Sequence, residues 1–462
     1  MKLEKNKLSL YQQEIYYGQL INSKSPAYNI GCYIIFKGKL DIDKLKSIIE
    51  NLPFVFDIYN FKYNLKEEEP SFYVKDTIEK LIVDEVNFSL EDTPKEKAIE
   101  WMRKEFNATF DLPKGKLYKY TIIKIGENES WVMLKVHHLL LDGFGFFLKC
   151  NYILKEYGKQ KGGINKEILY PSYYDKAIKS LEYLKSEQYI KDREYWKEKY
   201  KVIPSSIVGI KKEGKSLEGG RYTIPVPKSD KDFLIRLSNQ VKVGIPQLTI
   251  AALLIYYGKT TSQTAFSIGV PIHNRSGREE RKTLGMFSKI LPFKGEYLPN
   301  QTLLDFIQII KQGQHSDFRH KLYPLSHLNR ELQLLAKERQ QIFDIQVNYE
   351  PFLQRGAYLP NLSIEVHHLT GNLGLLTPLS FRWSDYGEGF PMKLHVDYQY
   401  KYFNLPEIEI FVERLFFILR QFESSLNNPV KNINILSKSE EEELLYAFNA
   451  TEQEYPKDKT IV

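Results

Sequence analysis

The stretch Lys135-Val136-His137-His138-Leu139-Leu140-Leu141-Asp142-Gly143-Phe144-Gly145 is the most informative part of the sequence. The apolar residues before the histidines predict a strand, and the residues after Gly143 predict a helix. A tight turn carrying Asp142 and Gly143 joins the two. Because successive strand side chains face opposite ways, His137 and His138 are expected to point apart. One of them can be structural while the other faces a cavity.

This turn offers acid–base or hydrogen-bond chemistry. A neutral imidazole with a pKa of about 6.5 can accept a proton or a hydrogen bond from an incoming amine or hydroxyl. Asp142 is spaced to fold back and hold the loop by pairing with a cation, and Gly143 permits a close backbone approach. A histidine pair alone is more often structural. No metal site is expected, because adjacent strand histidines cannot easily chelate one ion and no third ligand has suitable spacing.

A second histidine pair allows an internal comparison. His367 and His368 also end a strand-like run, but Leu369-Thr370-Gly371-Asn372 follows without an Asp-Gly. We interpret this pair as structural or as the lining of a cleft.

The rest of the chain predicts an α/β protein with mixed strands. The expected strands are Tyr28–Leu40, Phe72–Val74, Leu117–Gly126, Ser130–His137, Phe266–Pro271, Ile342–Tyr349, Asn361–His368 and Met392–Tyr398. The expected helices are Asp41–Leu52, Thr93–Phe110, Phe144–Tyr157, Ser229–Val241, Ile245–Tyr257, Leu303–His315 and Leu405–Leu426. Residues 170–200 predict a long amphipathic helical stretch, interrupted once. A junction is expected near residues 160–175 or in the looser segment 202–220, and both halves share the α/β pattern of two related subdomains.

Composition limits the function. The 462 residues carry 65 Lys and Arg against 58 Asp and Glu, a net charge of +7, and the basic residues are interleaved with acidic ones. No basic block or RNA-binding signature indicates a nucleic-acid partner. The two cysteines, Cys32 and Cys150, lie among apolar residues, as expected for buried thiols in a reducing compartment. No signal peptide or membrane span is evident, so a soluble, cytoplasmic protein is expected.

The motif and its flanks resemble a known family. His137-His138-x-x-x-Asp142-Gly143 resembles the HHxxxDG motif of the condensation domains of nonribosomal peptide synthetases and their acyltransferase relatives. Further segments resemble the family in order along the whole chain. These are the opening Leu8–Tyr16, the crossover segments Tyr170–Ala177 and Asp192–Trp196, then Gly269–Arg275, Leu284–Phe287 with Leu291-Pro292, Tyr323-Pro324 and Phe343–Ile345. The tail Phe448–Pro456 is similar to the linker that leads into an adenylation domain.

The resemblance implies two chloramphenicol-acetyltransferase-like subdomains forming a V-shaped pseudodimer. Residues 1–170 would form the first, 171–440 the second, and 441–462 a linker towards a missing adenylation domain. Donor and acceptor peptidyl carrier domains would bring phosphopantetheine arms into a tunnel between the subdomains, and the domain itself would bind no cofactor. Neither nucleic acid nor membrane is an expected partner. The implied reaction is amide-bond formation between a donor acyl thioester and a carrier-bound aminoacyl amine, in antibiotic or lipopeptide biosynthesis.

The resemblance also assigns roles by position. His138 matches the histidine that engages the attacking amine, as a base or as an orienting group, and His137 should be buried and structural. Asp142 should hold the loop with Arg275 as its ionic partner, and the Gly143 N–H should approach the developing oxyanion or the substrate.

Two departures from the family pattern accompany these roles. Asn51–Asp57 lacks the family's usual arginine, and Ser288–Ile290 replaces the usual Asn-Thr.

Other activities are compatible with the motif. An epimerisation domain or an ester-forming acyltransferase shares the superfamily, and a non-catalytic recruitment module shares the fold. If Met1 is the native start, an initiating role is expected, with a fatty acyl or other donor that lacks a free α-amine.

Overall fold

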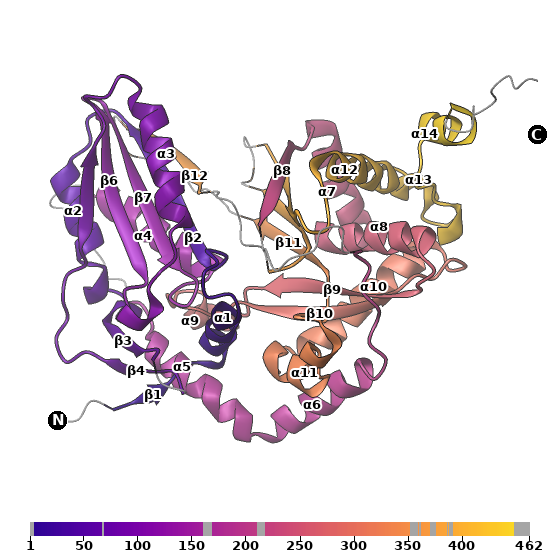
Figure 1. The fold of residues 1–462 in the computed structure, drawn as a ribbon, viewed down its shortest axis with the longest axis horizontal. Coiled ribbons are helices and arrows are strands. Elements are labelled where there is room, and N and C mark those ends of the chain that lie inside the picture. The colour runs from indigo at the N-terminus through magenta and orange to yellow at the C-terminus, as the bar shows by residue number, and fades with distance from the viewer. Residues whose placement is uncertain are drawn as a thin grey trace, which may run out of the picture.

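The computed structural model describes residues 4–66, 69–159, 169–209, 218–351, 359, 362–369, 376–385, 387 and 391–447. They form two subdomains, each a β-sheet covered by helices, which lie side by side (Figure 1). The predicted α/β class is confirmed. Helices α5 (Tyr173–Glu182) and α6 (Glu187–Lys199) run beneath both subdomains and are separated by one break, as the sequence predicted.

The first subdomain is built on a mixed sheet with the order β12-β2-β7-β6-β5 among the described residues. Its strands are β2 (Asn29–Lys37), β5 (Val83–Asn87), β6 (Tyr118–Gly126), β7 (Glu129–His137) and β12 (Ser363–His368). Helices α2 (Ile42–Glu50) and α4 (Gly143–Gly158) pack on one face of the sheet, and α3 (Pro94–Asn107) packs on the other. The near-continuous apolar sequence of β7 follows from this burial on both faces.

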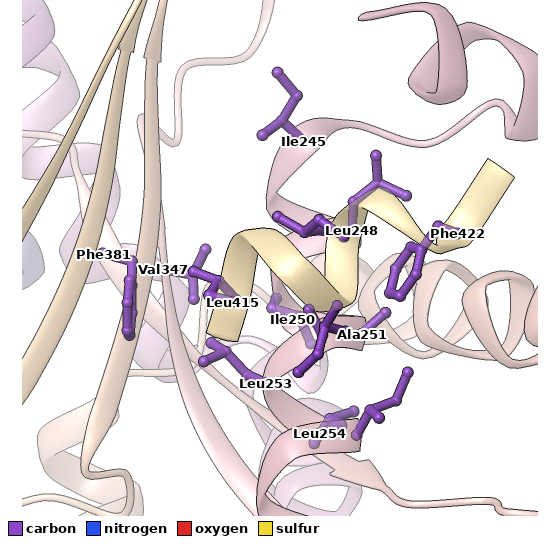
Figure 2. Packing of buried hydrophobic residues seen from close by; sticks show 14 of the residues in the cluster. Ile245, Leu248, Ile250, Ala251, Leu253, Leu254, Val347, Phe381, Leu415 and Phe422 are labelled. Atoms are coloured by element: carbon purple, nitrogen blue, oxygen red, sulfur yellow. The ribbon is translucent and has the colours of Figure 1, made fainter. Parts of the chain in front are cut away.

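The second subdomain is built on a sheet with the order β10-β9-β11-β13-β14-β8. Its strands are β8 (Gly219–Pro225), β9 (Ala265–Ile272), β10 (Lys289–Glu296), β11 (Ile345–Pro351), β13 (Leu379–Asp385) and β14 (Lys393–Gln399). One face packs against α7 (Lys228–Val241), α8 (Ile245–Thr260), α10 (Leu303–Arg319) and α12 (Leu405–Arg420). Figure 2 shows this core, where Leu253 of α8 and Leu415 of α12 approach Val347 and Phe381 of the sheet. Helix α8 is apolar on nearly all sides, as its central position requires.

One strand crosses between the subdomains. β12 comes from the second half of the chain but pairs antiparallel with β2, in the register His367↔Tyr33 and His368↔Cys32. The predicted subdomain 171–440 is therefore wrong for this segment, which belongs to the first sheet. Without β12, strand β2 would be an edge strand with unpaired backbone N–H and C=O groups. The hydrogen bonds to β12 satisfy these groups, although β12 lies far from β2 in the sequence.

The remaining elements in the described ranges are a small sheet and five α-helices, of which α1 lies between the two subdomains (Figure 1). They are the small sheet β1 (Asn6–Lys7), β4 (Ser71–Val74) and β3 (Phe61–Asn64), and the helices α1 (Leu10–Ile21), α9 (Gly277–Glu280), α11 (Leu325–Glu331), α13 (Phe422–Ser425) and α14 (Lys438–Glu442). The expected helix Leu405–Leu426 is thus broken at Gln421. Cys32 and Cys150 are both buried free thiols, as predicted. Of the predicted linker 441–462, the part after Ala447 lies outside the described residues.

Across the described ranges, no single helix is long and apolar enough to cross a bilayer. One sharply bent helix pair, α7 with α8, would satisfy that test by length and composition alone.

Candidate active site

His138 follows the last residue of β7 at the edge of the first subdomain. Its backbone N–H donates to the Tyr28 carbonyl at 2.7 Å, so the pairing with the β2 side of the sheet continues through this residue. Its Nδ1 is buried and has no hydrogen-bond partner on another residue within the part of the chain that the structure describes. Burial lowers the pKa of the imidazole, although the Asp142 carboxylate and the residue's own carbonyl oppose this. The ring is therefore neutral at neutral pH.

His137 is buried on the opposite side, with 2% of its surface exposed. Its Nδ1 accepts from the Leu139 N–H at 3.1 Å, which leaves Nε2 to donate to Gln19 Oε1 at 3.2 Å. Burial lowers its pKa to about 3, so it stays neutral. Both ring nitrogens are occupied by protein, and the residue orients the turn.

Asp142 joins the motif loop to the second subdomain. One carboxylate oxygen accepts from the Gly145 N–H at 2.7 Å and so caps helix α4. The other accepts from Arg275 Nη1 at 2.6 Å and from the Phe287 and Ser288 N–H groups, both at 2.9 Å. Burial alone would raise the pKa of this carboxyl, but the Arg275 guanidinium and the N–H donors hold it below its usual value.

Arg275, which follows β9, is the cationic partner that the sequence predicted. Both side chains of the pair are completely inaccessible to solvent. The guanidinium lies between the rings of Phe144 and Phe287, 4.7 and 4.4 Å from their centroids, and donates to the Gly285 carbonyl at 3.1 Å. Nε and Nη1 also donate to the Glu280 and His273 carbonyls at 3.1 and 3.3 Å, so each guanidinium nitrogen donates to a protein oxygen, as a buried charge requires.

The segment that lacks the family's usual arginine has another structural role. Asp57 accepts from Ser172 Oγ at 2.7 Å and from the Tyr173 and Tyr174 N–H groups at 2.9 and 3.0 Å. It thereby fixes the first turn of α5, the helix that leads to the second subdomain.

The glycines of the loop differ in their surroundings. A Cβ added to Gly143 would meet no atom within 4 Å, so no protein backbone makes a close approach there. A Cβ on Gly145 would instead lie 2.9 Å from the Gly285 carbonyl, and one on Gly285 would lie 2.1 Å from the Tyr173 ring. The close approach between the subdomains therefore depends on Gly145 and Gly285, whereas Gly143 faces open space at the start of α4.

Helix α1 carries residues whose role the sequence did not reveal. Gln12 Nε2 donates to the Leu139 carbonyl at 3.1 Å, and Gln19 holds His137 as described above. Ser9 caps the helix and contacts the Tyr173 hydroxyl at 3.0 Å, which in turn donates to the Met286 carbonyl at 2.7 Å. The spacing of Ser9 and Gln12 matches the capping-box pattern, a signal that could have predicted the start of α1 but not its contact with the motif loop.

A cavity of about 570 Å³ lies on the other side of α1, between that helix and α11 of the second subdomain. Glu14 lines it and accepts from the Ser326 N–H at 3.1 Å. Lys289, which occupies the altered family segment, is buried nearby and donates to the Tyr323 carbonyl at 3.1 Å. Burial raises the pKa of Glu14 and lowers that of Lys289 to about 8, while each charge partly stabilises the other. Among the described residues, no three His, Cys, Asp or Glu side chains are placed to hold a metal ion.

The sequence profile of the family described as "Condensation domain" matches residues 2–445. The chain belongs to the condensation-domain family. Curated relatives of this condensation domain include a plipastatin synthase of Bacillus subtilis (strain 168), 25% identical over 97% of this chain, and gramicidin S synthase 2 of Aneurinibacillus migulanus, 23% identical over 94%. This chain covers 18% and 10% of their respective lengths, so it spans less than a fifth of either relative.

Solved structures agree in fold. The starter condensation domain of rhizomide synthetase RzmA, as a mutant in complex with C8-CoA and Leu-SNAC, has a TM-score of 0.81 at 20% identity. That comparison covers 94% of this chain and 98% of the other. The first condensation domain of the calcium-dependent antibiotic synthetase has a TM-score of 0.79 at 17% identity, covering 94% and 99%. The predicted fold of two chloramphenicol-acetyltransferase-like subdomains is therefore confirmed.

Condensation domains of nonribosomal peptide synthetases catalyse amide-bond formation, and this chain is such an acyltransferase domain. These domains need no bound cofactor of their own and work with carrier and adenylation domains in multidomain synthetases.

Proposed function

We propose that this condensation domain transfers a donor acyl group from a carrier-bound thioester to the amine of a carrier-bound aminoacyl acceptor, with His138 as the group that engages the amine. The observation that carries the proposal is the state of His138. Its ring is neutral and only partly buried, its Nδ1 makes no hydrogen bond to another residue in the described part of the chain, and its loop is fixed from both subdomains through Asp142 and Arg275.

The proposed step forms one bond and breaks one. The amine nitrogen attacks the thioester carbonyl carbon, the C–N bond forms, and the C–S bond breaks after a tetrahedral intermediate. His138 accepts a hydrogen bond or the proton from the amine, and the departing pantetheine sulfur takes up a proton. A neutral imidazole is suited to this because the acceptor must lose a proton as it attacks.

The start of α4 supports stabilisation of the oxyanion. The first N–H groups of a helix have no partner within the helix, and the helix dipole favours negative charge there. Gly143 stands at this position, beside open space that a Cβ would otherwise occupy. We assign its N–H to the developing oxyanion, where such donors contribute most to catalysis.

Holding both reactants between two rigidly joined subdomains replaces a bimolecular encounter with a reaction inside one complex. In the best cases this lowers the activation free energy by about 7 kcal/mol or more. In this proposal residues 1–170 and 171–440, apart from β12, form the two subdomains, and 441–462 lead towards an adenylation domain. An initiating role stays a prediction.

A single-turnover assay with loaded donor and acceptor carriers tests the proposal. His138→Ala should reduce amide formation at least 100-fold, the usual contribution of a general acid–base group, with an unchanged circular dichroism spectrum. His367→Ala is the matched control, because His367 belongs to the second pair and stacks on Tyr33 at the exposed face of β12. Wild-type rates for His138→Ala would refute its role, and binding of carriers without any turnover would favour the recruitment module. Ester formation with a hydroxyl acceptor, or inversion of the donor's α-carbon without transfer, would identify the other two alternatives.

A further inference from the structure

The only two cysteines of the chain meet in the core of the first subdomain. Cys32 lies on β2 and Cys150 on α4, far apart in the sequence. Both are free thiols, with 2% and 9% of their surface exposed. The two side chains lie within hydrogen-bonding reach of each other. The fold therefore brings both thiols of this chain to one point.

Lys149 adds a charged group to this pair. Its side chain is completely buried, and its Nζ has no hydrogen-bond partner in the described part of the chain. The Nζ atom lies 3.8 Å from the ring centroid of Phe146 and 4.7 Å from that of Tyr120. An amine buried without a hydrogen bond is costly, so a purely structural position would favour an apolar residue. We call Cys32, Cys150 and Lys149 the thiol cluster.

The two sulfur atoms of the thiol cluster differ chemically. The contact with Cys32 and the charge of Lys149 lower the pKa of the Cys150 thiol, although burial opposes this. The same contact, together with burial, raises the pKa of Cys32. Burial lowers the pKa of Lys149 to about 8, so its amine can take up and release a proton near neutral pH. Because the thiolate is the reactive form, Cys150 is the nucleophile of the pair and Cys32 is its partner.

The thiol cluster lies within reach of the motif turn. Cys150 follows Gly143, the first residue of α4, by about two helical turns, or roughly 10.5 Å. Cys32 pairs with Leu134 of β7, which precedes His138 by about 13 Å along the strand. A bond between the two sulfur atoms would therefore tie the helix that begins at the motif to the sheet that carries His138.

We propose that the thiol cluster is a redox switch, in which hydrogen peroxide joins Cys32 and Cys150 in a disulfide and thereby slows acyl transfer. The effect on transfer rests on the proposed function. A disulfide requires the sulfur atoms to approach to about 2.05 Å, so its formation draws α4 towards β2. A displacement of about 1 Å at an active site can cost about 100-fold in rate. Where cells keep thiols reduced, such disulfides form transiently and respond to oxidants.

The proposed oxidation consumes one peroxide and two thiols. The Cys150 thiolate attacks one peroxide oxygen and the O–O bond breaks, which leaves a sulfenic acid on Cys150 and a hydroxide. Lys149 receives the proton of the Cys150 thiol and passes it to that hydroxide, giving water. The Cys32 sulfur then attacks the sulfenic sulfur, the S–S bond forms and the S–O bond breaks, and the departing hydroxide leaves as water with the proton of Cys32. Two electrons pass from the thiols to the peroxide, and a dithiol reductant reverses the change by exchange.

Thiol counting on the full chain tests the disulfide. Reduced protein is exposed to hydrogen peroxide, desalted, unfolded in urea and labelled with a maleimide, and the labels are counted by intact mass. We expect both thiols to be lost together and both to return after treatment with dithiothreitol. Lys149→Met should slow this loss at least threefold. Lys155→Met, which replaces an exposed lysine of the same helix, is the matched control and should leave the rate unchanged.

The single-turnover assay tests the consequence for transfer. Peroxide is removed before the loaded carriers are added, so that it cannot oxidise their pantetheine thiols. Oxidised wild type should transfer the acyl group at least tenfold more slowly than reduced wild type, and dithiothreitol should restore the rate. Cys32→Ala should transfer at the rate of reduced wild type with and without peroxide treatment, because it can form no internal disulfide.

The outcomes separate the switch from the proposed function. Loss of one label alone, or of none, would overturn the disulfide, and an unchanged oxidation rate in Lys149→Met would overturn the role of Lys149. Disulfide formation with an unchanged transfer rate would overturn the switch, as would equal inhibition of Cys32→Ala by peroxide. If Cys32→Ala fails to fold, the label counts and transfer rates of wild type still decide. Failure of reduced wild type to transfer any acyl group would overturn the proposed function, and with it the effect on transfer, whereas the label counts would still decide the disulfide.

Discussion

Replacing Asp142 by asparagine removes one negative charge and keeps the shape of the side chain. The oxygen that caps α4 can still accept from the Gly145 N–H, but an amide nitrogen then faces three donors, Arg275 Nη1 and the Phe287 and Ser288 N–H groups. Breaking a fully buried ion pair in this way costs about 3–5 kcal/mol. Since typical domains are stable by about 5–15 kcal/mol, Asp142→Asn should lose a large share of the unfolding free energy.

Asp41→Asn provides the matched control. Asp41 also caps a helix, α2, through one hydrogen bond from the Lys44 N–H at 2.9 Å, but no cation of the described residues forms an ion pair with it. Asparagine caps helices as well as aspartate does, so the unfolding free energy should change by less than about 0.5 kcal/mol. Urea unfolding followed by circular dichroism measures both variants.

The pH dependence distinguishes loss of charge from loss of packing. The native pKa of Asp142 is below its usual value, so its ionised form stabilises the fold above the unfolded-state pKa of about 3.9. That contribution is lost as the pH falls through the native pKa. The difference between wild type and Asp142→Asn should be constant from pH 6 to 8 and shrink below about pH 4. Equal, small losses for Asp142→Asn and Asp41→Asn, or a pH-independent difference, would refute the reasoning.

Three further predictions concern the residues around the turn. His137→Ala should lower the melting temperature, because the contacts with Gln19 and Leu139 are lost. In the wild type, the unfolding free energy rises with pH between 4 and 6, since the unfolded imidazole binds a proton that the native one does not. His137→Ala should reduce that slope by up to about 1.4 kcal/mol per pH unit. An unchanged thermal melt and pH slope would contradict this. Gly285→Ala should cost about 1–3 kcal/mol in urea unfolding, because its Cβ would overlap the Tyr173 ring, and wild-type stability would show that no such overlap exists. Gly143→Ala should change the unfolding free energy by less than about 0.5 kcal/mol, yet slow acyl transfer in the single-turnover assay. An unchanged transfer rate would show that the substrate does not occupy the space beside Gly143.

Much of the architecture could be predicted because burial imposes local periodicity. The strand before His137, the helix after Asp142 and the single break between α5 and α6 all follow from local patterns. β10 was missed because Pro292 lies within it, and proline argues against a strand unless the strand is at an edge, as β10 is. β13 alternates apolar and polar residues from Leu379 to Ser384, so a search for period two could have found it.

Spatial partners were predicted less well than elements. The pairing of Asp142 with Arg275 could be anticipated from the family pattern, but the close packing of Gly145 on Gly285 could not. The sequence around a glycine does not reveal which distant residue packs against it. For the same reason, the pairing of β12 with the first sheet was not predicted. A strand's sequence states which faces are buried and does not identify which sheet it joins.

The crossing of β12 bears on how this domain can be divided. A fragment ending before the second half would leave β2 as an open edge, with a row of unpaired backbone groups beside the apolar side chains Ile34 and Phe36. Such an edge is a template for intermolecular pairing. A fragment of the second half would carry the six residues of β12 without the strand that satisfies them. Separately produced halves should therefore aggregate. Co-production should restore a soluble complex, because β12 of the second half can then pair with β2 of the first half.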